Sequence, residues 1–290
     1  NAYYNPSNNE IVLPAGIFLI AGLPDQFADD ALVYGYAAAS TIGHEITHGF
    51  DDQGRQYDAK GNLTDWWTPE DAANFKSRAG GIVRQFSGYE PIKGIHVNGD
   101  ATQGENIADL GGVVLGLDAF KKTEQYKKGE KIAGLTPVQR YFLGYALGWL
   151  GHENEESLRQ QLRSDVHSPA SLRVNGPFAN LPEFYEAFGI KEGDAMWRAD
   201  SVRAGPRATS PTHAVQVLRT RAPSHACKRV LRAGAWISAS SPCRTTSRFS
   251  RSAAFAAPRH SSRSCSVRSS GSQAVRATRS ALGRPSPTSR

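Results

Sequence analysis

Residues 44–48 read H-E-I-T-H, which places two histidines four positions apart with a glutamate directly after the first. On an α-helix, residues four apart lie one above the other, with roughly 5–6 Å between their Cβ atoms. The imidazoles of His44 and His48 can therefore converge on one metal ion, and zinc is the usual metal for this pattern. Glu45 would lie beside the metal, where it can take a proton from a water molecule. The alternative is a pair of structural histidines on one helix, in the core or at the surface.

A second segment, residues 104–109, carries two carboxylates at the same spacing and reads G-E-N-I-A-D. A catalytic zinc needs a third protein ligand and one open position for water. Glu105 can be that ligand, and Asp109 can accept the other ring N–H of a ligand histidine, which fixes the tautomer. The alternative is a solvated acidic helix start that the helix dipole favours. It explains the acids, but not their combination with residues 44–48.

Periodic apolar positions predict the helices that would carry these side chains. Residues 26–50 repeat apolar side chains every three to four positions, and Asp29 and Asp30 suit the first turn of such a helix. A β-rich stretch broken by Pro14 and Gly16 predicts short strands within residues 11–20. We therefore expect an α+β fold that is mostly helical with a small mixed sheet. Further helices are expected at residues 68–86, 102–122, 137–150, 154–164 and 181–188.

The charges divide the chain into two parts. Residues 1–203 contain 18 of the 34 basic residues and all 27 acidic ones, a formal charge of −9, while residues 204–290 contain the other 16 basic residues and no acid, a formal charge of +16. The three cysteines all lie after residue 203, which excludes a disulfide-stapled domain before it. No apolar run is long enough for a membrane helix, so we expect any signal or anchor to lie upstream of residue 1.

Residues 204–290 are rich in serine, arginine, alanine and proline, and they show no sustained period. Such a composition buries too little apolar surface to offset its ordering entropy, so we expect a disordered tail. Its charge would give salt-dependent, nonspecific affinity for nucleic acid. Only three aromatic residues interrupt it, so we expect no specific single-strand binding. The abrupt loss of acids suggests a second hypothesis, that the tail is an out-of-frame product of a GC-rich coding sequence.

The first 203 residues resemble the neprilysin and endothelin-converting enzyme family of zinc metallopeptidases, including its bacterial oligopeptidases. The resemblance rests on several motifs in order, and the cysteine-free body is similar to the bacterial branch. These motifs are N-A-Y-Y at 1–4, I-V-L-P-A-G at 11–16, G-H-E-I-T-H-G-F-D-D at 43–52, G-E-N-I-A-D at 104–109 and D-V-H-S-P at 165–169.

The resemblance implies a thermolysin-like catalytic domain of the gluzincin type and a role for each matching residue. It implies one zinc ion held by His44, His48 and Glu105, with Glu45 as general base. It also implies that His167 steadies the oxyanion of the tetrahedral intermediate and that Asp165 orients His167. The residues that would bind substrate are Asn1 and Ala2 in an edge strand, Trp149 in the wall of an apolar pocket, and Arg173 at a substrate carbonyl.

The expected function is zinc-dependent hydrolysis of oligopeptides, with a preference for an apolar residue after the cut bond. Peptides are then the partners, and the family usually works outside the cytoplasm. The family's long helical region upstream, which closes over the cleft, and the upstream strands of its catalytic sheet have no counterpart in this sequence. Two alternatives stay open, an inactive fragment that keeps the motifs and nonspecific nucleic-acid binding through the tail.

Overall fold

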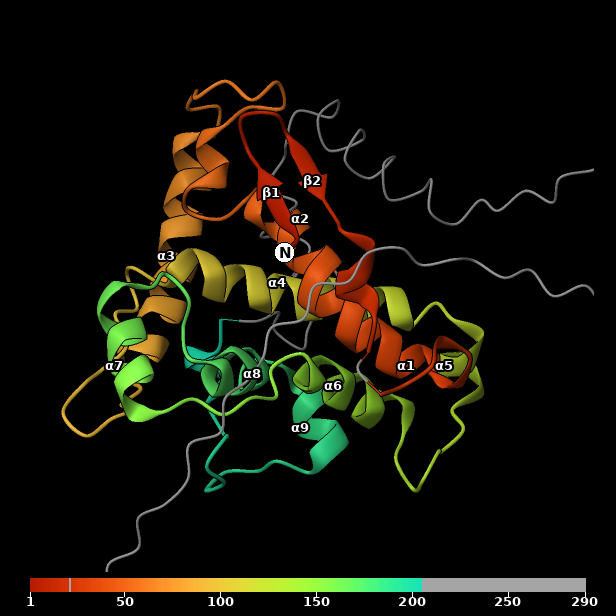
Figure 1. Ribbon diagram of the computed structural model, residues 1–290. Coiled ribbons are helices and arrows are strands. Elements are labelled where there is room, and N and C mark those ends of the chain that lie inside the picture. Colours follow the sequence, from red (N-terminus) through yellow and green to blue (C-terminus); the bar gives the residue numbers. More distant parts are fainter. Residues whose placement is uncertain (21, 205–290) are drawn as a thin grey trace, which may run out of the picture. The chain divides into compact units, whose positions relative to one another are not determined.

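The computed structural model of the chain describes residues 1–20 and 22–204 (Figure 1). We expected residues 204–290 to form a disordered or out-of-frame tail that carries the three cysteines and has affinity for nucleic acid. Apart from Ala204, these residues lie outside the described part. Ala204 itself belongs to the folded body, since its backbone N–H donates to Asn180 Oδ1 over 2.9 Å. It also packs on a small buried cluster that contains Ile82 and Phe86. Ala204 therefore packs against the described body.

The N-terminal segment forms a β-hairpin. Strand β1 (Tyr3–Asn5) pairs with β2 (Glu10–Val12) in antiparallel register, and the connecting turn places Asn9 at φ 49°, a left-handed conformation that asparagine tolerates. After β2, Pro14 begins a 3₁₀ turn over Ala15–Phe18, so the strand expected there is absent. We also expected a small mixed sheet. The only sheet among the described residues is this antiparallel pair, so the expectation of a mixed sheet is wrong.

One continuous helix leads to the H-E-I-T-H segment. It consists of α1 (Asp30–Val33), a π-helical stretch η3 (Tyr34–Gly43) and α2 (His44–His48). The helix starts at Asp30 rather than at residue 26, because Asp29 caps it by accepting a backbone N–H of the first turn, and Asp25–Phe27 form a separate 3₁₀ turn. A π-helical stretch is rare and often lies at a functional site, and this one ends directly at His44.

Most of the expected helices are present within a few residues of their predicted bounds. Two short helices were not predicted, α5 (Glu124–Lys128) and α8 (Ala170–Phe178). None of the helices in the described part is both long and apolar enough to span a membrane. The predicted helices are α3 (Pro69–Ser87), α4 (Gln103–Phe120), α6 (Pro137–Leu147), α7 (Glu155–Ser164) and α9 (Pro182–Phe188).

Helix α4 runs through the middle of the described body, with α2 and the hairpin on one side of it and α6, α8 and α9 on the other (Figure 1). Its buried face meets an aromatic core, in which the rings of Phe120 and Tyr141 stack 5.9 Å apart. Each fully buried side chain of this kind stabilises the fold by about 1.5–3 kcal/mol. The core residues include Val113, Leu117, Phe120, Tyr141, Phe142, Tyr145, Phe178 and Leu181.

Two glycines set the crossing of α4 with the helix that bears the histidines. A Cβ atom on Gly43 would stand 2.9 Å from the Cα atom of Gly112, and one on Gly112 would stand 2.8 Å from the backbone nitrogen of His44. Both distances are too short for real Cβ contacts, so the two backbones touch directly. This contact brings His44 to the helix that carries Glu105 and Asp109.

Candidate metal centre

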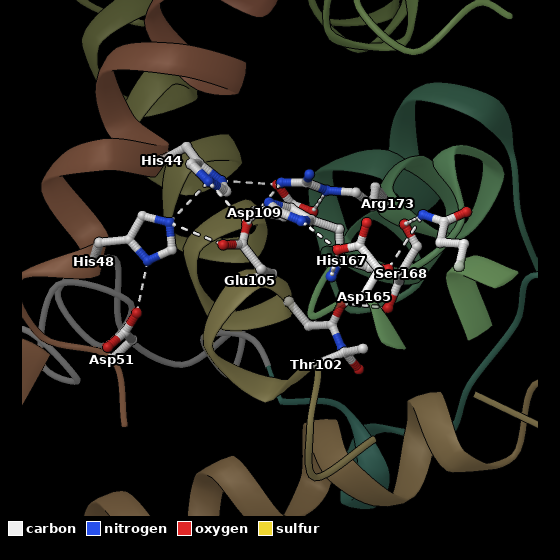
Figure 2. Close-up of polar contacts among 12 residues, drawn as sticks. His44, His48, Asp51, Thr102, Glu105, Asp109, Asp165, His167, Ser168 and Arg173 are labelled. Carbon is white, nitrogen blue, oxygen red and sulfur yellow. Dashed lines mark hydrogen bonds and ion pairs between the residues drawn. The ribbon is translucent and has the colours of Figure 1, made fainter. Parts of the chain in front are cut away.

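His44, His48 and Glu105 converge at one point between α2 and α4 (Figure 2). The two Nε2 atoms of the histidines lie 3.0 Å apart. The carboxylate of Glu105 approaches both rings, with Oε2 3.3 Å from His44 Nε2 and Oε1 3.5 Å from His48 Nε2. One ligand atom from each residue lies within 4.8 Å of the other two. The structure thus brings together the three residues that the sequence predicted as ligands.

This donor set fits a zinc ion. Both histidines turn Nδ1 toward a carboxylate, which leaves the two Nε2 atoms facing each other and the carboxylate of Glu105. Two imidazole lone pairs in this arrangement repel each other unless a cation or a proton lies between them. Zinc accepts two imidazoles and one carboxylate and leaves a fourth position open. The geometry therefore favours a metal site over two structural histidines.

Asp109 lies behind His44 and is completely buried. Its Oδ1 is 2.9 Å from His44 Nδ1, so the two groups form an ion pair when the ring is protonated. Burial by itself lowers the pKa of His44, but the contacts with Asp109 and Glu105 outweigh it and raise this pKa to about 9. Because a protonated ring cannot bind a metal, metal binding must release this proton.

Arg173 of α8 neutralises the buried carboxylate of Asp109. Its Nε and Nη2 donate to the two oxygens of Asp109 over 2.7 and 2.8 Å, and Nη2 also lies 3.2 Å from Glu105 Oε2. Burial raises the pKa of Asp109, but the positive charge of Arg173 outweighs this effect and holds the pKa well below its usual value. The guanidinium carbon also lies 4.1 Å from the ring centre of Trp149. Arg173 is itself buried, so its ion pair with Asp109 is not an exposed surface salt bridge.

Asp51 is a site residue that the sequence analysis missed. Its Oδ2 lies 2.6 Å from His48 Nδ1, and its Oδ1 accepts the backbone N–H groups of Gln53 and Gly54. It therefore does for His48 what Asp109 does for His44. A signal was present, because Asp51 follows His48 by three positions. However, Asp51 lies after the end of α2, where helix spacing predicts nothing.

The loop of residues 165–169 brings His167 to the same site. Asp165 Oδ1 lies 2.7 Å from His167 Nδ1 and accepts the backbone N–H of His167 over 2.8 Å, so the ring is held by its near neighbour. On its other side, His167 Nε2 lies 3.3 Å from Glu105 Oε2. The side chains of both Asp165 and His167 are 44% exposed, so this pair lies at the open edge of the site.

A cavity of about 460 Å³ opens onto these side chains. It gathers most of the residues that the sequence predicted for catalysis and substrate binding, although they come from distant parts of the chain, and of these residues only Asp165 does not line it. Glu45 lies in its wall with only 8% exposure, next to the metal ligands. The predicted residues that line the cavity are Asn1, Ala2, His44, Glu45, His48, Glu105, Trp149, His167 and Arg173.

Residues 1–204 match the model of peptidase family M13. The chain is 42% identical over 205 residues to neprilysin-1 of Trittame loki and 42% identical over 199 residues to endothelin-converting enzyme 1 of Rattus norvegicus. These matches cover 68% of this chain but only 28% and 26% of the two relatives.

Among solved structures, the chain is similar to the zinc metalloprotease Zmp1 of Mycobacterium tuberculosis in complex with an inhibitor. The identity is 42% and the TM-score 0.66, over 71% of this chain and 32% of that one. Equal identities to animal and mycobacterial proteins do not favour the bacterial branch that we expected.

Proposed function

Because this chain belongs to peptidase family M13, we propose that it carries the zinc site and the catalytic residues of a metalloendopeptidase that hydrolyses oligopeptides. The observation that carries the proposal is the convergence of His44, His48 and Glu105, with Glu45 in the wall of the same cavity. The chain spans between a quarter and a third of the length of the relatives and solved structures described above.

Zinc, when bound by the three ligands, supplies a Lewis acid that polarises the scissile carbonyl and acidifies a water molecule. Glu45 takes the proton from that attacking water and later passes it to the leaving amine. The buried position of Glu45 suits this task, because a carboxylate shielded from bulk water has fewer competing partners. Asp109 and Asp51 hold the ligand rings so that Nε2 of each faces the metal position.

His167 donates from Nε2 to the oxygen that becomes negative as the carbonyl is attacked. Asp165 Oδ1 lies 2.7 Å from Nδ1 of His167, and this contact fixes the orientation of the ring. Because both side chains are partly exposed, an incoming peptide can reach them without a movement of the core.

The substrate peptide makes backbone hydrogen bonds with Asn1 and Ala2, which directly precede β1 rather than lying in the strand that we expected there. Trp149 forms a wall for an apolar side chain after the cut bond, and Arg173 holds a substrate carbonyl. Two of the guanidinium nitrogens of Arg173 already bind Asp109 and Glu105, so Nη1 is the group left for this contact. The family resemblance also supports a location of this protein outside the cytoplasm. The comparisons give the nucleic-acid hypothesis no support, and it is not proposed.

The test is to measure zinc content and peptide hydrolysis of the purified chain alongside the Glu45→Gln variant. We expect one zinc per chain in both proteins, with turnover lowered by about 10²–10⁴-fold in the variant, the usual contribution of a general base. Absence of zinc from the folded chain would refute the metal site. Zinc without hydrolysis would instead support the inactive-fragment alternative, and full activity in the variant would place the base elsewhere.

A further inference from the structure

A chain of buried hydrogen bonds joins α4 to the loop that carries His167 (Figure 2). Ser168 Oγ donates to Asn106 Oδ1 over 2.8 Å, and Asn106 Nδ2 donates to Thr102 Oγ1 over 2.9 Å. Thr102 Oγ1 in turn donates to the backbone oxygen of Asn98 over 3.0 Å. Ser168, Asn106 and Thr102 are 1%, 0% and 4% exposed, so water does not compete for these bonds.

The direction of every hydrogen bond in this network follows from its last acceptor, the backbone oxygen of Asn98. A backbone carbonyl can only accept, so the hydroxyl of Thr102 must donate to Asn98 and can offer only a lone pair to Asn106. Asn106 must then present its NH₂ group to Thr102 and its oxygen to Ser168. Ser168 is left as the donor. The amide of Asn106 therefore has one orientation, and a flipped amide would break both of its bonds.

The network fixes the part of the loop that the Asp165–His167 pair does not fix. The contact between Asp165 and His167 holds the imidazole relative to the loop that carries both residues. Because both side chains are partly exposed and lie on that loop, the contact does not hold the loop to the rest of the protein. Ser168 ties the same loop to α4, and Gln161 of α7 supports it by donating to the carbonyl of His167 over 3.2 Å. Asn106 directly follows Glu105 along α4. The network therefore links the backbone next to His167 to the backbone next to the third metal ligand.

We propose that Asn106 and Ser168 are positioning residues, which clamp the loop of residues 165–169 to α4 and so set the place of His167 relative to the metal ligands. The inference rests on the proposed function, because His167 acts on the substrate only in a peptidase. Neither residue of the clamp touches the cavity, so its effect on the reaction passes through His167.

The first test measures the clamp without activity, by amide hydrogen exchange of residues 165–169 in the zinc-loaded chain. Ser168→Ala removes one oxygen atom and leaves Asn106 Oδ1 buried without its donor. The loss of one such bond should speed exchange in the loop by roughly tenfold. Ser171→Ala, the same change at an exposed position of α8, is the matched control and should leave exchange unchanged. Equal protection of the loop in both variants would overturn the clamp.

Thr102→Val is a second variant that acts on the network from its far end. Valine keeps the shape of threonine but cannot accept the bond from Asn106, and the hydrogen bonds of Thr102 join it to Asn98 and Asn106 rather than to the loop. We expect faster exchange in residues 165–169 here as well, by a smaller factor than in Ser168→Ala. Exchange that changes only around residue 102 would overturn the linkage.

The second test asks whether the effect on catalysis passes through His167. In the otherwise unaltered chain, Ser168→Ala should lower kcat by about 10–100-fold, because a misplaced donor loses most of its effect. KM and zinc affinity should change by less than about threefold. In a His167→Ala background, the same change should alter kcat by less than about twofold. An equal loss in both backgrounds, or no loss in the first, would overturn the positioning role.

The two tests separate this inference from the proposed function. If the unaltered zinc-loaded chain cleaves no peptide, the proposed function fails together with the catalytic part of the inference, while hydrogen exchange still decides the clamp. If the chain cleaves peptides and Ser168→Ala does not affect kcat, the function stands and the inference fails.

Discussion

Zinc affinity should depend steeply on pH because His44 holds a proton that the metal must displace. The pKa of His44 is raised to about 9, so below that pH most metal-free chains carry a proton on this ring. Because the pKa of His44 is raised, protonation of this ring competes with zinc at every pH below about 9, and the competition grows as the pH falls. Each unit of pH below 9 therefore weakens apparent zinc binding by about tenfold, and between pH 8 and pH 6 the dissociation constant should rise by about 100-fold.

Competition with a chromophoric chelator, corrected for the chelator's own protonation, measures this dependence. Asp109→Asn keeps the shape of the side chain but removes the charge that holds the proton on His44, so the slope should flatten. At pH 8 and above, the same variant should bind zinc about 10–100-fold more weakly, because the ligand ring has lost its carboxylate partner. Asp165→Asn is the matched control, since Asp165 contacts His167 and not His44. A zinc affinity that stays constant from pH 6 to pH 8 would refute the reasoning.

Three further changes test other parts of the structure. His167→Ala should lower kcat by about 10²–10³-fold with a smaller effect on KM, since an oxyanion donor acts in the transition state, and a rise in KM alone would assign it to ground-state binding. Arg173→Met should lower the free energy of unfolding by about 3–5 kcal/mol, because it leaves a buried carboxylate unpaired; urea denaturation measures this, with the exposed Arg163→Met as control. Deletion of residues 205–290 should leave zinc affinity unchanged, and resequencing the coding DNA checks the out-of-frame hypothesis, which an intact frame through residue 290 would contradict.

The two histidine ligands could be predicted because they lie on one helix. Helix spacing alone places His44 over His48, and the same rule pairs Glu105 with Asp109. Asp51 and the Asn106–Ser168 contact escaped prediction for the opposite reason. Asp51 lies in a loop without a period, and Asn106 meets Ser168 only through the tertiary fold. Pairs that lie on one helix are readable from their spacing. The meeting of Glu105 with the two histidines was predicted only because a zinc site needs a third ligand, and no comparable chemical requirement pointed to Asn106 and Ser168.

Helix α8 shows how a local rule can fail. No helix was predicted there, and Pro169, Gly176 and Pro177 are residue types typical of turns. The helix forms because Pro177 lies next to its last residue and disrupts only the final turn. Proline cannot donate to the carbonyl of Arg173, four positions earlier, and Tyr145 of α6 donates to that oxygen instead over 3.1 Å. A tertiary hydrogen bond thus replaces the bond that proline removes, and no propensity scale contains that information.

The contact between Gly43 and Gly112 has a consequence for how this chain can vary. The separation of the two ligand-bearing helices is set by backbone touching backbone, which no side chain can adjust. Exchanges among apolar residues elsewhere in the core, such as Leu117 or Phe142, can alter volume and stability while the ligands keep their spacing. An alanine at either glycine would instead wedge the helices apart and move His44 away from Glu105. In mutant libraries selected for metal binding, we expect broad tolerance across the aromatic core and almost none at these two positions.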